Sequence, residues 1–539
     1  MQRLLAELDQ IIGIDGLSTI ASWLDRLSFV FLVLMVLAAP HSIAATQTAW
    51  GVGMLFFVAR LFFTPRPSLR TGWLGVALVA LFLWTVLSSL SSYAPDISFG
   101  KLRSAALFLI FFFVIGVVRS FRAVYFLAFA LVASCMFSVL LMPLQRIVGR
   151  GVEIRTLQPD GALARSGIRP GDVLLTVDGE KIGSPDEIAS AFREKESVTL
   201  KYQRIEFYHD ATIRRADASA AEIENGTLGI SEWKRSRSWR SAGFYGHYTT
   251  YAEVLQLIGS LLVGIFVAAF LSGRQIENGG SLLENFAKPP ANLSGSKLRI
   301  AATGFFVLFC VVAFCVALLL TVTRAPQLAF SISGFVIMLL GASRRWLFTA
   351  LLIAIPVAAV GLFVLQRSRE VGFFDAKDNS TNWRMMVYRE GFDLWTQNAR
   401  HFFFGVGMDS VKRYACDWGL FDNCHQPMGH FHSTPLQLLV ERGIPALLLW
   451  LTVLAIYART LWRALYRKSG EEAIWRDGKL FPDFSPVLNR GIWLGCLGGL
   501  IGFFASSLVH YNYGDGEVVM IFYLLMGLAV KTGRLAEKE

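Results

Sequence analysis

Long apolar runs dominate the pattern of hydrophobic and polar positions along this chain. The runs are roughly 16 to 23 residues long, and a helix of that length, at about 1.5 Å per residue, crosses the hydrocarbon core of a bilayer. They occur near residues 28–45, 48–64, 73–92, 103–118, 122–143, 250–272, 299–321, 325–343, 346–366, 443–459, 490–509 and 517–532. The pattern therefore predicts twelve membrane-spanning helices.

Two long polar insertions interrupt the runs, one at residues 144–249 after the fifth run and one at residues 367–442 after the ninth. Lys and Arg gather in the cytoplasmic loops of membrane proteins. In this chain they follow the even-numbered runs, as at Arg66, Arg70, Arg119, Arg122, Arg344 and Arg345. We therefore expect both termini in the cytoplasm and both insertions in the periplasm, where ATP and nucleotide sugars are absent.

Composition supports this interpretation and changes the meaning of the charge. Of 539 residues, 54% are hydrophobic and 17% are charged, and the mean hydropathy is +0.49. The formal net charge of +11 could attract nucleic acid, but in a membrane protein it more often reflects arginine-rich loops and anionic lipid or substrate. No recognisable nucleic-acid-binding module is present, so we expect membrane lipids and no nucleic acid as partners.

The first insertion has the pattern of a small soluble α+β domain. "DVLLTV" and "SVTLKY" alternate as strands do, and Gly179 in "VDGEKI" suits a tight turn with positive φ. "SPDEIASAFRE" predicts a helix with Ser184 as N-cap and Pro185 at its first position. The run "GALARSGIRPGDVLLTVDGEKI" resembles a PDZ domain of the bacterial type.

By that resemblance, Gly149, Arg150, Gly151 and Val152 form the loop that binds a peptide carboxylate, while the peptide adds a strand to a sheet edge. This implies a peptide or protein partner. The loop sequence "GRGV" departs from the usual hydrophobic pattern of the family, and a structural or docking role is the alternative.

The second insertion combines an amphipathic helix with a turn and a group of histidines. In "NWRMMVYREGFDLW" apolar residues recur at helical spacing, as in a helix on the membrane interface. Gly405 and Gly407 in "FFFGVGM" permit a sharp turn. The chain has 8 His, of which His425, His430 and His432 precede the tenth run. Cys416 and Cys424 lie between turn and histidines, where an oxidising compartment permits a disulfide.

These segments resemble the motifs of the O-antigen ligase and polymerase superfamily. The family has an Arg-containing helix, an aromatic stretch leading to Gly-Val-Gly, and a His-x-His segment followed by Leu-Gln and Glu-x-Gly. Here these correspond to "NWRMMVYREGFDLW", "ARHFFFGVGMDS" and "HFHSTPLQLLVERGIP", and "RSAGFYGHYTTYAEVLQ" and "LLLTVTRAPQLAF" fit two earlier motifs. The resemblance covers roughly residues 25 to 535 apart from the PDZ-like insert. One departure is Ser433, where the family usually has Asn.

Transfer of a glycan from a polyprenyl diphosphate requires charge stabilisation on the leaving diphosphate and activation of an acceptor hydroxyl. Arginine suits the first task because its fork of N–H groups binds phosphate oxygens in pairs. By the resemblance, Arg324 and Arg384 are catalytic, while Arg240 and Arg389 bind the diphosphate or glycan. The alternative for these arginines is that they extend to the membrane interface only.

His432 is the predicted base, because an imidazole with a pKa near 6.5 is largely neutral at physiological pH. His430 and His247 are predicted to line the same site. The alternative is a hydrogen-bonded interfacial histidine. A zinc site is disfavoured because no Glu or Cys occurs at the helical spacing of a hydrolytic zinc motif, and the resemblance implies an enzyme without metal or cofactor.

We therefore predict an all-α polytopic membrane protein of about twelve transmembrane helices, with a small α+β PDZ-like periplasmic domain inserted after the fifth helix. The expected segments are helices one to five (1–143), the PDZ-like domain (144–206), a basic periplasmic connector (207–249), helices six to nine (250–366), a periplasmic catalytic loop (367–442), and helices ten to twelve with a cytoplasmic tail (443–539).

The predicted function is glycan transfer from an undecaprenyl diphosphate-linked oligosaccharide to an acceptor hydroxyl, in the manner of an O-antigen ligase, in a bacterial inner membrane. Three acceptors stay open: lipid A core for a ligase, another lipid-linked glycan for a polymerase, and a protein for an oligosaccharyltransferase. A transporter or a PDZ-bearing membrane scaffold is the alternative from another class. An intramembrane protease is disfavoured because the sequence lacks His-Glu-x-x-His.

Overall fold

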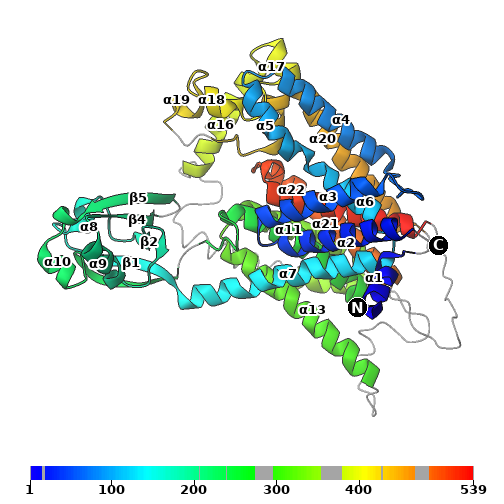
Figure 1. The fold of residues 1–539 in the computed structure, drawn as a ribbon, viewed down its shortest axis with the longest axis horizontal. Coiled ribbons are helices and arrows are strands. Elements are labelled where there is room, and N and C mark those ends of the chain that lie inside the picture. Colours follow the sequence, from blue (N-terminus) through cyan, green and yellow to red (C-terminus); the bar gives the residue numbers. More distant parts are fainter. Residues whose placement is uncertain are drawn as a thin grey trace. The chain divides into compact units, whose positions relative to one another are not determined.

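The structure is a computed structural model that describes residues 2–14, 18–204, 207–237, 240–272, 295–353, 379–425, 429–467 and 485–537. The chain divides into two compact units. The first, called the helical unit, comprises Met1–Ser138 and Ala242–Glu539. The second, called the inserted unit, comprises Val139–Ser241 and contains a β-sheet. Figure 1 labels the elements of both units.

The helical unit consists of helices and short helical turns before and after the insert. Those before it are α1 (Gln2–Ile12), α2 (Thr19–Ala38), α3 (Ile43–Arg60), α4 (Gly72–Leu90), α5 (Pro95–Ala105), η1 (Ala106–Phe108), α6 (Leu109–Val117) and α7 (Phe121–Val148), which continues into the insert. Those after it include α11 (Tyr248–Phe266), η3 (Val267–Leu271), α13 (Gly295–Leu320), α14 (Arg324–Gly341), α16 (Asn379–Thr396), α17 (Ala399–Phe404), α18 (Ser410–Tyr414), α19 (Leu420–Asn423), α20 (Thr434–Tyr466), α21 (Ser485–Ser507), η4 (Asn512–Gly514) and α22 (Gly516–Leu535).

Ten helices among the described residues are long and apolar enough to cross a membrane. They are Thr19–Ala38, Gly72–Leu90, Pro95–Val117, Phe121–Val148, Tyr248–Leu271, Ala302–Leu320, Arg324–Gly341, Thr434–Tyr466, Pro486–Ser507 and Gly516–Leu535. The predicted run 48–64 corresponds to α3, which is helical but is not among these ten. The predicted run 346–366 extends past residue 353 and lies mostly outside the described residues. The membrane-spanning, mostly helical fold is confirmed.

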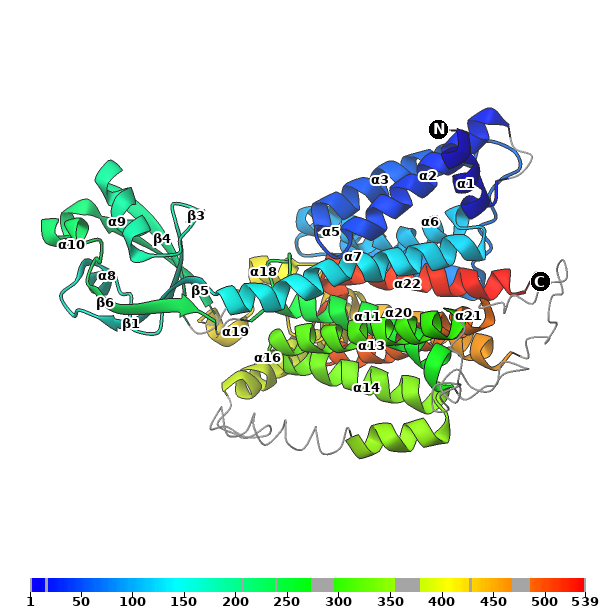
Figure 2. The ribbon, with the colours of Figure 1, turned by 90° about the horizontal axis from the view of Figure 1, so that it is seen from below.

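The centre of the helical unit is built from α11, α14, α21 and α22, which Figure 2 shows packed along one another. Small residues permit the closest of these contacts. A Cβ at Gly264 of α11 would overlap the backbone of Gly495 in α21, so these two helices meet backbone to backbone. Small residues at such positions are typical of helix pairs in membranes, where close packing replaces the hydrophobic effect.

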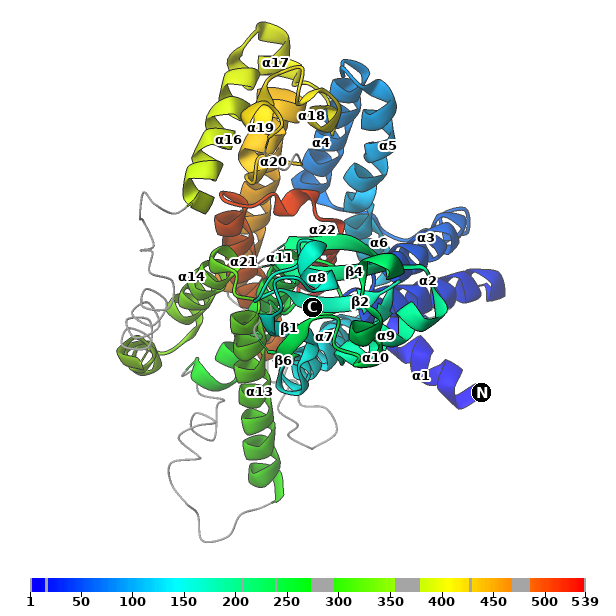
Figure 3. The same cartoon turned by 90° about the vertical axis from the view of Figure 1, so that its left-hand side faces the viewer.

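The segments of the second insertion pack beside α4 and α5. Figure 3 shows α16 to α19 next to the first half of α20, and α4 contacts α20 directly. Arg413 of α18 donates to both carboxylate oxygens of Asp96 in α5 at 2.9 and 2.8 Å. Cys416 and Cys424 form a disulfide, so the pairing that the sequence permits is present. Inside that loop, the N–H of Phe421 donates to Glu390 of α16 at 2.7 Å, which fixes the loop on α16.

The inserted unit contains an antiparallel sheet with short helices. Its strands are β1 (Arg150–Leu157), β2 (Val173–Val177), β3 (Glu180–Lys181), β4 (Ser197–Arg204), β5 (Phe207–Arg214) and β6 (Ile230–Ser236), and its helices are α8 (Ala162–Arg165), α9 (Pro185–Glu194) and α10 (Ala220–Glu224). The strand order is β5-β4-β2-β1-β6, with β3 paired to β2. Both predicted strands, the turn at Gly179 (φ +89°) and the helix that begins at Pro185 are confirmed.

The sheet continues beyond residue 206, the predicted end of the PDZ-like domain. β5 pairs with β4 along its whole length, from Ser197 opposite Arg214 to Arg204 opposite Phe207. β6 pairs with β1, with Ile154 opposite Trp233. Residues 207–236 were expected to form a basic connector, but they contribute two strands and pack Ile213 and Ile230 into the core of this unit. The alternation in "FYHDATIR" is the signal that indicates β5.

Candidate active site

The helix α20 is kinked near its start, and the kink exposes a backbone carbonyl. Gly443 has non-helical backbone angles (φ +74°, ψ 179°), and Pro445 follows it. Because proline has no N–H, the carbonyl of Glu441 loses its helical partner. Two groups from other segments replace that partner, namely the N–H of Gly407 at 2.9 Å and the hydroxyl of Ser88 at 3.2 Å. The kink therefore joins α20 to the Gly-Val-Gly turn and to α4.

The glycines of two sequence motifs meet at this kink without room for a side chain. A Cβ at Gly443 would overlap the carbonyl oxygen of Phe403, and one at Gly405 would overlap the backbone of Glu441. Gly405 and Gly407 also have positive φ, +72° and +98°, which glycine adopts most readily. The Gly-Val-Gly and Glu-x-Gly motifs thus lock two chain segments together, and the sharp turn predicted at Gly405 and Gly407 is confirmed.

Glu441 and Gln437 connect the kink to the histidine segment. The N–H of Phe431 donates to Gln437 Oε1 at 2.8 Å, and Gln437 Nε2 donates to Glu441 Oε1 at 2.9 Å. The same Glu441 oxygen accepts the N–H of Asp409 at 2.9 Å. Because the two histidines flank Phe431, whose ring is buried, this relay fixes their backbone relative to the turn at Asp409.

His430 and His432 lie ring to ring at the start of α20. Their ring centroids are 4.1 Å apart, and the N–H of His432 donates to Nδ1 of His430 at 3.2 Å. His430 Nδ1 is therefore an acceptor, which places the proton of its neutral ring on Nε2. His432 has φ +48°, a sparsely populated conformation for a residue with a Cβ, and such backbone strain is concentrated at functional sites.

The hydroxyl of Ser433 caps α20 by accepting the N–H of Leu436 at 3.4 Å. Asn and Ser are both favoured caps. Ser433, which stands where the family usually has Asn, therefore still provides the N-cap of α20. The helix begins at Thr434, nine residues before the predicted run, so that the histidines stand directly at its N-terminus.

The amphipathic helix α16 covers the histidine pair. The indole of Trp383 meets the ring of His432 edge to face at 4.7 Å, and the hydroxyl of Tyr388 donates to the carbonyl of His432 at 3.0 Å. Arg384 lies between Trp383 and Tyr388 in sequence, and its charge contributes to lowering the pKa of His432. Its Nε is buried and has no hydrogen-bond partner among the described residues. An uncompensated buried N–H of a cation is suited to an anionic ligand.

Both histidines are held neutral. Burial, followed by the charges of His510 and Lys412, lowers the pKa of His430 to about 4. Burial also lowers the pKa of His432 far below its usual value, and electrostatic interactions with His430, His510 and Arg384 lower it further. At neutral pH each ring therefore keeps a lone pair that can accept a proton or a hydrogen bond.

A third histidine, His510, approaches the pair from the loop between α21 and α22. Its ring lies 6.1 Å from His430 and 6.3 Å from His432, centroid to centroid. Its Nδ1 is 3.0 Å from Oε1 of Glu253, which also accepts the hydroxyl of Ser506. Burial alone would lower the pKa of His510, but the Glu253 carboxylate outweighs burial and raises that pKa. His510 is thus the histidine of this group that favours a positive charge.

A cavity of about 180 Å³ adjoins His430 and is strongly polar. Lys101 and Lys412 enter it and pair with Asp409 at 2.8 and 3.2 Å. Burial would raise the pKa of Asp409, but the hydrogen bond from Lys101 and the charges of both lysines outweigh it, so that the pKa is lowered. Arg442 also lines the cavity, and its Nε is buried without a hydrogen-bond partner in the described part of the chain. Cations therefore lie on two sides of the histidine pair.

Of the other predicted residues, His247 is brought to this site. It caps α11, with Nδ1 accepting the N–H of Thr249 at 3.3 Å, and its charge acts on both His430 and His432. Arg389 is on α16 but is 86% exposed and lies 4.0 Å from Asp393, so it does not share the buried face of Arg384. His425 is exposed, with Nδ1 2.6 Å from the carbonyl of Asp422.

The remaining predicted residues are placed in other elements. Arg324 is the first residue of α14 and is half-buried, and Arg240 is half-buried in the inserted unit. Gly149 and Gly151 have positive φ, +84° and +60°, at the start of β1. β1 pairs with β2 on one side and β6 on the other, so the outer strands of the sheet order are β5 and β6. Peptide binding at this loop stays a prediction.

Sequence reasoning missed several residues that build this site: Lys101, Tyr388, Asp409, Gln437, Glu441, Arg442 and His510. For some of them a signal existed. Gln437, Glu441 and Arg442 belong to the Leu-Gln and Glu-x-Gly motifs, which indicate the family without showing which of their side chains build the site. His510, by contrast, follows the eleventh span without any motif, and only the packing of α21 on α11 brings it to Glu253.

Comparison with known proteins agrees with these features. Residues 308–451 match the O-antigen ligase family, a range that includes α14, α16, the Gly-Val-Gly turn, the histidine pair and the kink of α20. Residues 153–204 match the PDZ domain family. The O-antigen ligase range contains most of the residues described above, whereas Lys101, His247 and His510 lie outside it.

Two curated relatives match a short stretch only. The magnetosome formation protease MamE of Magnetospirillum gryphiswaldense is 44% identical over 46 residues, which is 8% of this chain and 6% of that protein. MamE of Paramagnetospirillum magneticum is 47% identical over 47 residues, 9% of this chain and 6% of that protein. The chain thus spans a small part of these relatives, and their protease activity is not transferred to it.

An O-antigen ligase domain is a glycan-transferring module of membrane proteins, in accordance with the spanning helices and the polar site at their ends. The resemblances found in the sequence are confirmed: the chain contains an O-antigen ligase domain at residues 308–451 and a PDZ domain at residues 153–204.

Proposed function

We propose that this protein is a metal-independent glycosyltransferase that moves a glycan from an undecaprenyl diphosphate donor to an acceptor hydroxyl on the periplasmic face of a bacterial inner membrane. The observation that carries the proposal is the neutral pair His430 and His432 beside the buried, unpartnered Nε of Arg384. This arrangement supplies a proton acceptor and an anion-binding group within one site, as glycosyl transfer from a diphosphate requires.

In this proposal His432 accepts the proton of the acceptor hydroxyl. The hydroxyl oxygen bonds to the anomeric carbon of the donor sugar, and the bond from that carbon to the diphosphate oxygen breaks. The polyprenyl diphosphate leaves with the electron pair, and Arg384 and Arg324 stabilise its charge. His247 and His430 complete the proposed contacts with the diphosphate or the glycan, whereas the exposed Arg389 is proposed to contribute little.

The low pKa of His432 in the free enzyme is compatible with this role. Positive groups contribute to lowering it, namely Arg384 and His510. A diphosphate that binds to Arg384 brings negative charge into the same space and offsets them, which raises the pKa of His432. His432 therefore becomes a stronger base once the donor is bound, whereas in the empty site it stays unprotonated.

The acceptor is proposed to bind in the cavity on the His430 side of the pair. This cavity is lined by Lys101, Lys412 and Arg442 and also by Asp409, Glu441 and Asp515, so it offers both positive and negative groups to a polar acceptor such as lipid A core. We propose the ligase reaction because residues 308–451 match the O-antigen ligase family. Polymerisation on a second lipid-linked glycan and transfer to a protein remain the alternatives, and the PDZ domain is proposed to bind a peptide or protein partner in either case.

The test uses purified protein with an undecaprenyl diphosphate oligosaccharide. With the donor alone, lengthening of the lipid-linked chain would identify a polymerase. With lipid A core added, a ligase produces a lipid A glycan and releases undecaprenyl diphosphate. A peptide mixture forms the third arm, and EDTA in each arm tests independence from metal ions.

Two variants decide the site. We expect His432→Ala and Arg384→Ala to reduce transfer by a factor of about 100 or more, the usual contribution of a general base or a charge-stabilising group. His425→Ala is the matched control, because His425 is an exposed histidine of the same loop. Transfer at the normal rate by His432→Ala would remove that residue from the mechanism.

A further inference from the structure

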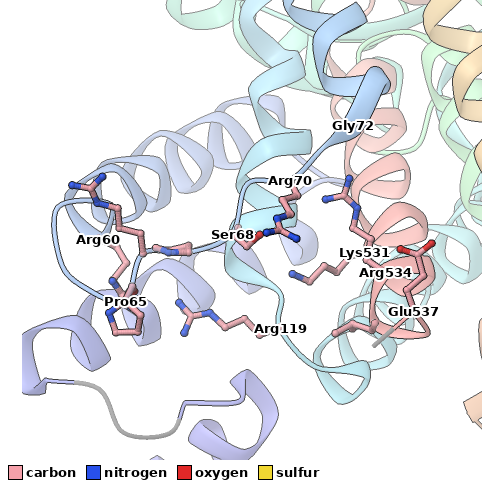
Figure 4. Close-up of a pocket in the computed structure, with 13 residues that line it drawn as sticks. Arg60, Pro65, Ser68, Arg70, Gly72, Arg119, Lys531, Arg534 and Glu537 are labelled. Atoms are coloured by element: carbon pink, nitrogen blue, oxygen red, sulfur yellow. Dashed lines mark hydrogen bonds between the residues drawn. The ribbon is translucent and has the colours of Figure 1, made fainter. Parts of the chain in front are cut away.

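A second cavity, of about 570 Å³, lies at the other end of α22. Three separate segments enclose it: the connection between α3 and α4, the connection between α6 and α7, and the last turn of α22. Figure 4 shows the side chains of Arg70 and Lys531 directed toward one space from two of these segments, while Arg119 extends toward Pro65. Its charged lining residues are Arg60, Arg66, Arg70, Arg119, Lys531, Arg534 and Glu537.

This cavity and the histidine site are separated by the thickness of a membrane. α22 begins at Gly516, directly after Asp515 in the wall of the first cavity, and ends at Leu535 in the wall of the second. At about 1.5 Å per residue its 20 residues span about 30 Å, the thickness of a hydrocarbon core. The basic cavity is therefore on the face opposite the histidines, the cytoplasmic face by the distribution of arginines.

Protein carboxylates balance only part of its charge. Arg60 and Arg119 share Asp25, at 3.0 and 2.6 Å, and Glu537 pairs with Arg467 at 3.2 Å. Arg66 and Arg70 are exposed, and neither forms an ion pair with a described carboxylate. The lining thus has an excess of positive charge from guanidinium groups, which bind phosphate oxygens in pairs.

Exposed apolar side chains flank, in sequence, the residues that line the cavity. On the segment that joins α3 to α4, Phe62 is 78% exposed and Leu69 is 37% exposed, and Trp73 in the first turn of α4 is 78% exposed. Aromatic side chains at such positions lie at the level of the lipid head groups. A ligand at this depth therefore has its phosphate in the cavity and its acyl chains beside Phe62 and Trp73, which favours a lipid over a free anion.

We propose that this cavity binds the two phosphates of a dianionic phospholipid head group. Two phosphates match the two sets of cations, one formed by Arg66 and Arg70 and one formed by Lys531 and Arg534. Basic pockets between membrane helices on this face are suited to such head groups. The site is distinct from the proposed transfer site, so lipid binding and glycan transfer are measured separately.

The test compares lipid retention by the full-length protein and a charge-neutral variant. Protein in detergent is mixed with cardiolipin, with phosphatidylglycerol or with inorganic pyrophosphate, and bound molecules are counted by native mass spectrometry. The variant is Arg66→Gln with Arg70→Gln, two exposed side chains whose replacement leaves the helix packing intact. The control is Arg344→Gln with Arg345→Gln, an exposed pair outside the cavity.

We expect the wild type and the control to retain one cardiolipin in preference to phosphatidylglycerol. The Arg66 and Arg70 variant should bind it about tenfold or more weakly, since each basic residue contributes about 1 kcal/mol to binding of anionic lipid. Equal retention by the variant and the control overturns the proposal. Binding of pyrophosphate as tight as that of cardiolipin overturns the lipid as the source of the phosphates.

Discussion

The close backbone contact between the Gly-Val-Gly and Glu-x-Gly motifs can be tested by the substitution Gly443→Ala. Gly443 has φ +74° and ψ 179°, a conformation that is almost restricted to glycine and costs other residues about 1–3 kcal/mol. The new Cβ would also overlap the carbonyl oxygen and the following amide of the chain at Phe403. Because both are backbone atoms, they cannot rotate away, and overpacking of this kind costs about 1–3 kcal/mol.

The two contributions together predict a loss of about 2–6 kcal/mol, reduced slightly because alanine also restricts the unfolded chain. The loss should be local to the kink. Shifting Phe403 displaces the Gly-Val-Gly turn, and with it the N–H of Gly407 that binds the carbonyl of Glu441. We therefore expect a lower melting temperature in detergent together with a strong decrease of glycan transfer.

Gly334→Ala is the matched control. Gly334 lies inside α14, has no positive φ, and a Cβ there would meet nothing within 4 Å. Alanine should be neutral or should stabilise by up to about 1 kcal/mol through helix propensity. If Gly443→Ala melts at the same temperature as Gly334→Ala and transfers glycan normally, the proposed backbone contact at the kink is wrong.

Four further outcomes are expected. Ser433→Ala should lose about 1 kcal/mol of stability in a thermal assay because the cap of α20 is lost, whereas Ser433→Asn should match the wild type. Arg389→Ala should change the transfer rate less than twofold while Arg384→Ala nearly abolishes it, because Arg389 is 86% exposed; equal losses would refute this distinction. Cys416→Ser with Cys424→Ser should destabilise the loop by about 2–3 kcal/mol, the chain entropy of a loop of this length, measured as increased proteolysis there. The pKa of His430 is lowered to about 4, so its contribution to stability is present above pH 6.5 and is lost as the pH falls toward about 4. The melting temperature of the wild type should therefore fall more steeply across that pH range than the melting temperature of His430→Gln.

Hydrophobic pattern alone predicted most of the helical fold, because a spanning helix must present about 20 apolar residues whatever it packs against. It also placed the insert and its first strands. It erred at boundaries where the helix continues into polar sequence. The first nine residues of α20 include Gln437, Glu441 and Arg442, which the hydrophobic pattern assigns to a loop. The side chains of Gln437 and Glu441 bind the backbone N–H groups of Phe431 and Asp409, and that information is not local in sequence.

In the candidate site, motif spacing indicates some of the residues, and helix packing brings in others. The histidine pair and Arg384 are close in space because they belong to one continuous segment and its adjoining helix, so motif spacing could indicate them. His510 follows the histidine pair by about 80 residues and lies in the loop between α21 and α22. It comes close to the pair because α21 packs on α11, which also brings Glu253 to this loop. A residue contributed by helix packing has no pattern of its own in the sequence.

The relay through Glu441 explains why the kink and the chemistry would change together. Its carbonyl holds the Gly-Val-Gly turn, while its side chain holds Gln437 and, through it, the backbone between the two histidines. A single residue thus connects a break in a membrane helix to the position of the proposed base. Because a polar network of this kind is costly when one member is left unpaired, Glu441→Ala, which removes the shared acceptor of Asp409 and Gln437, should displace the histidines and strongly reduce glycan transfer in the assay with purified protein.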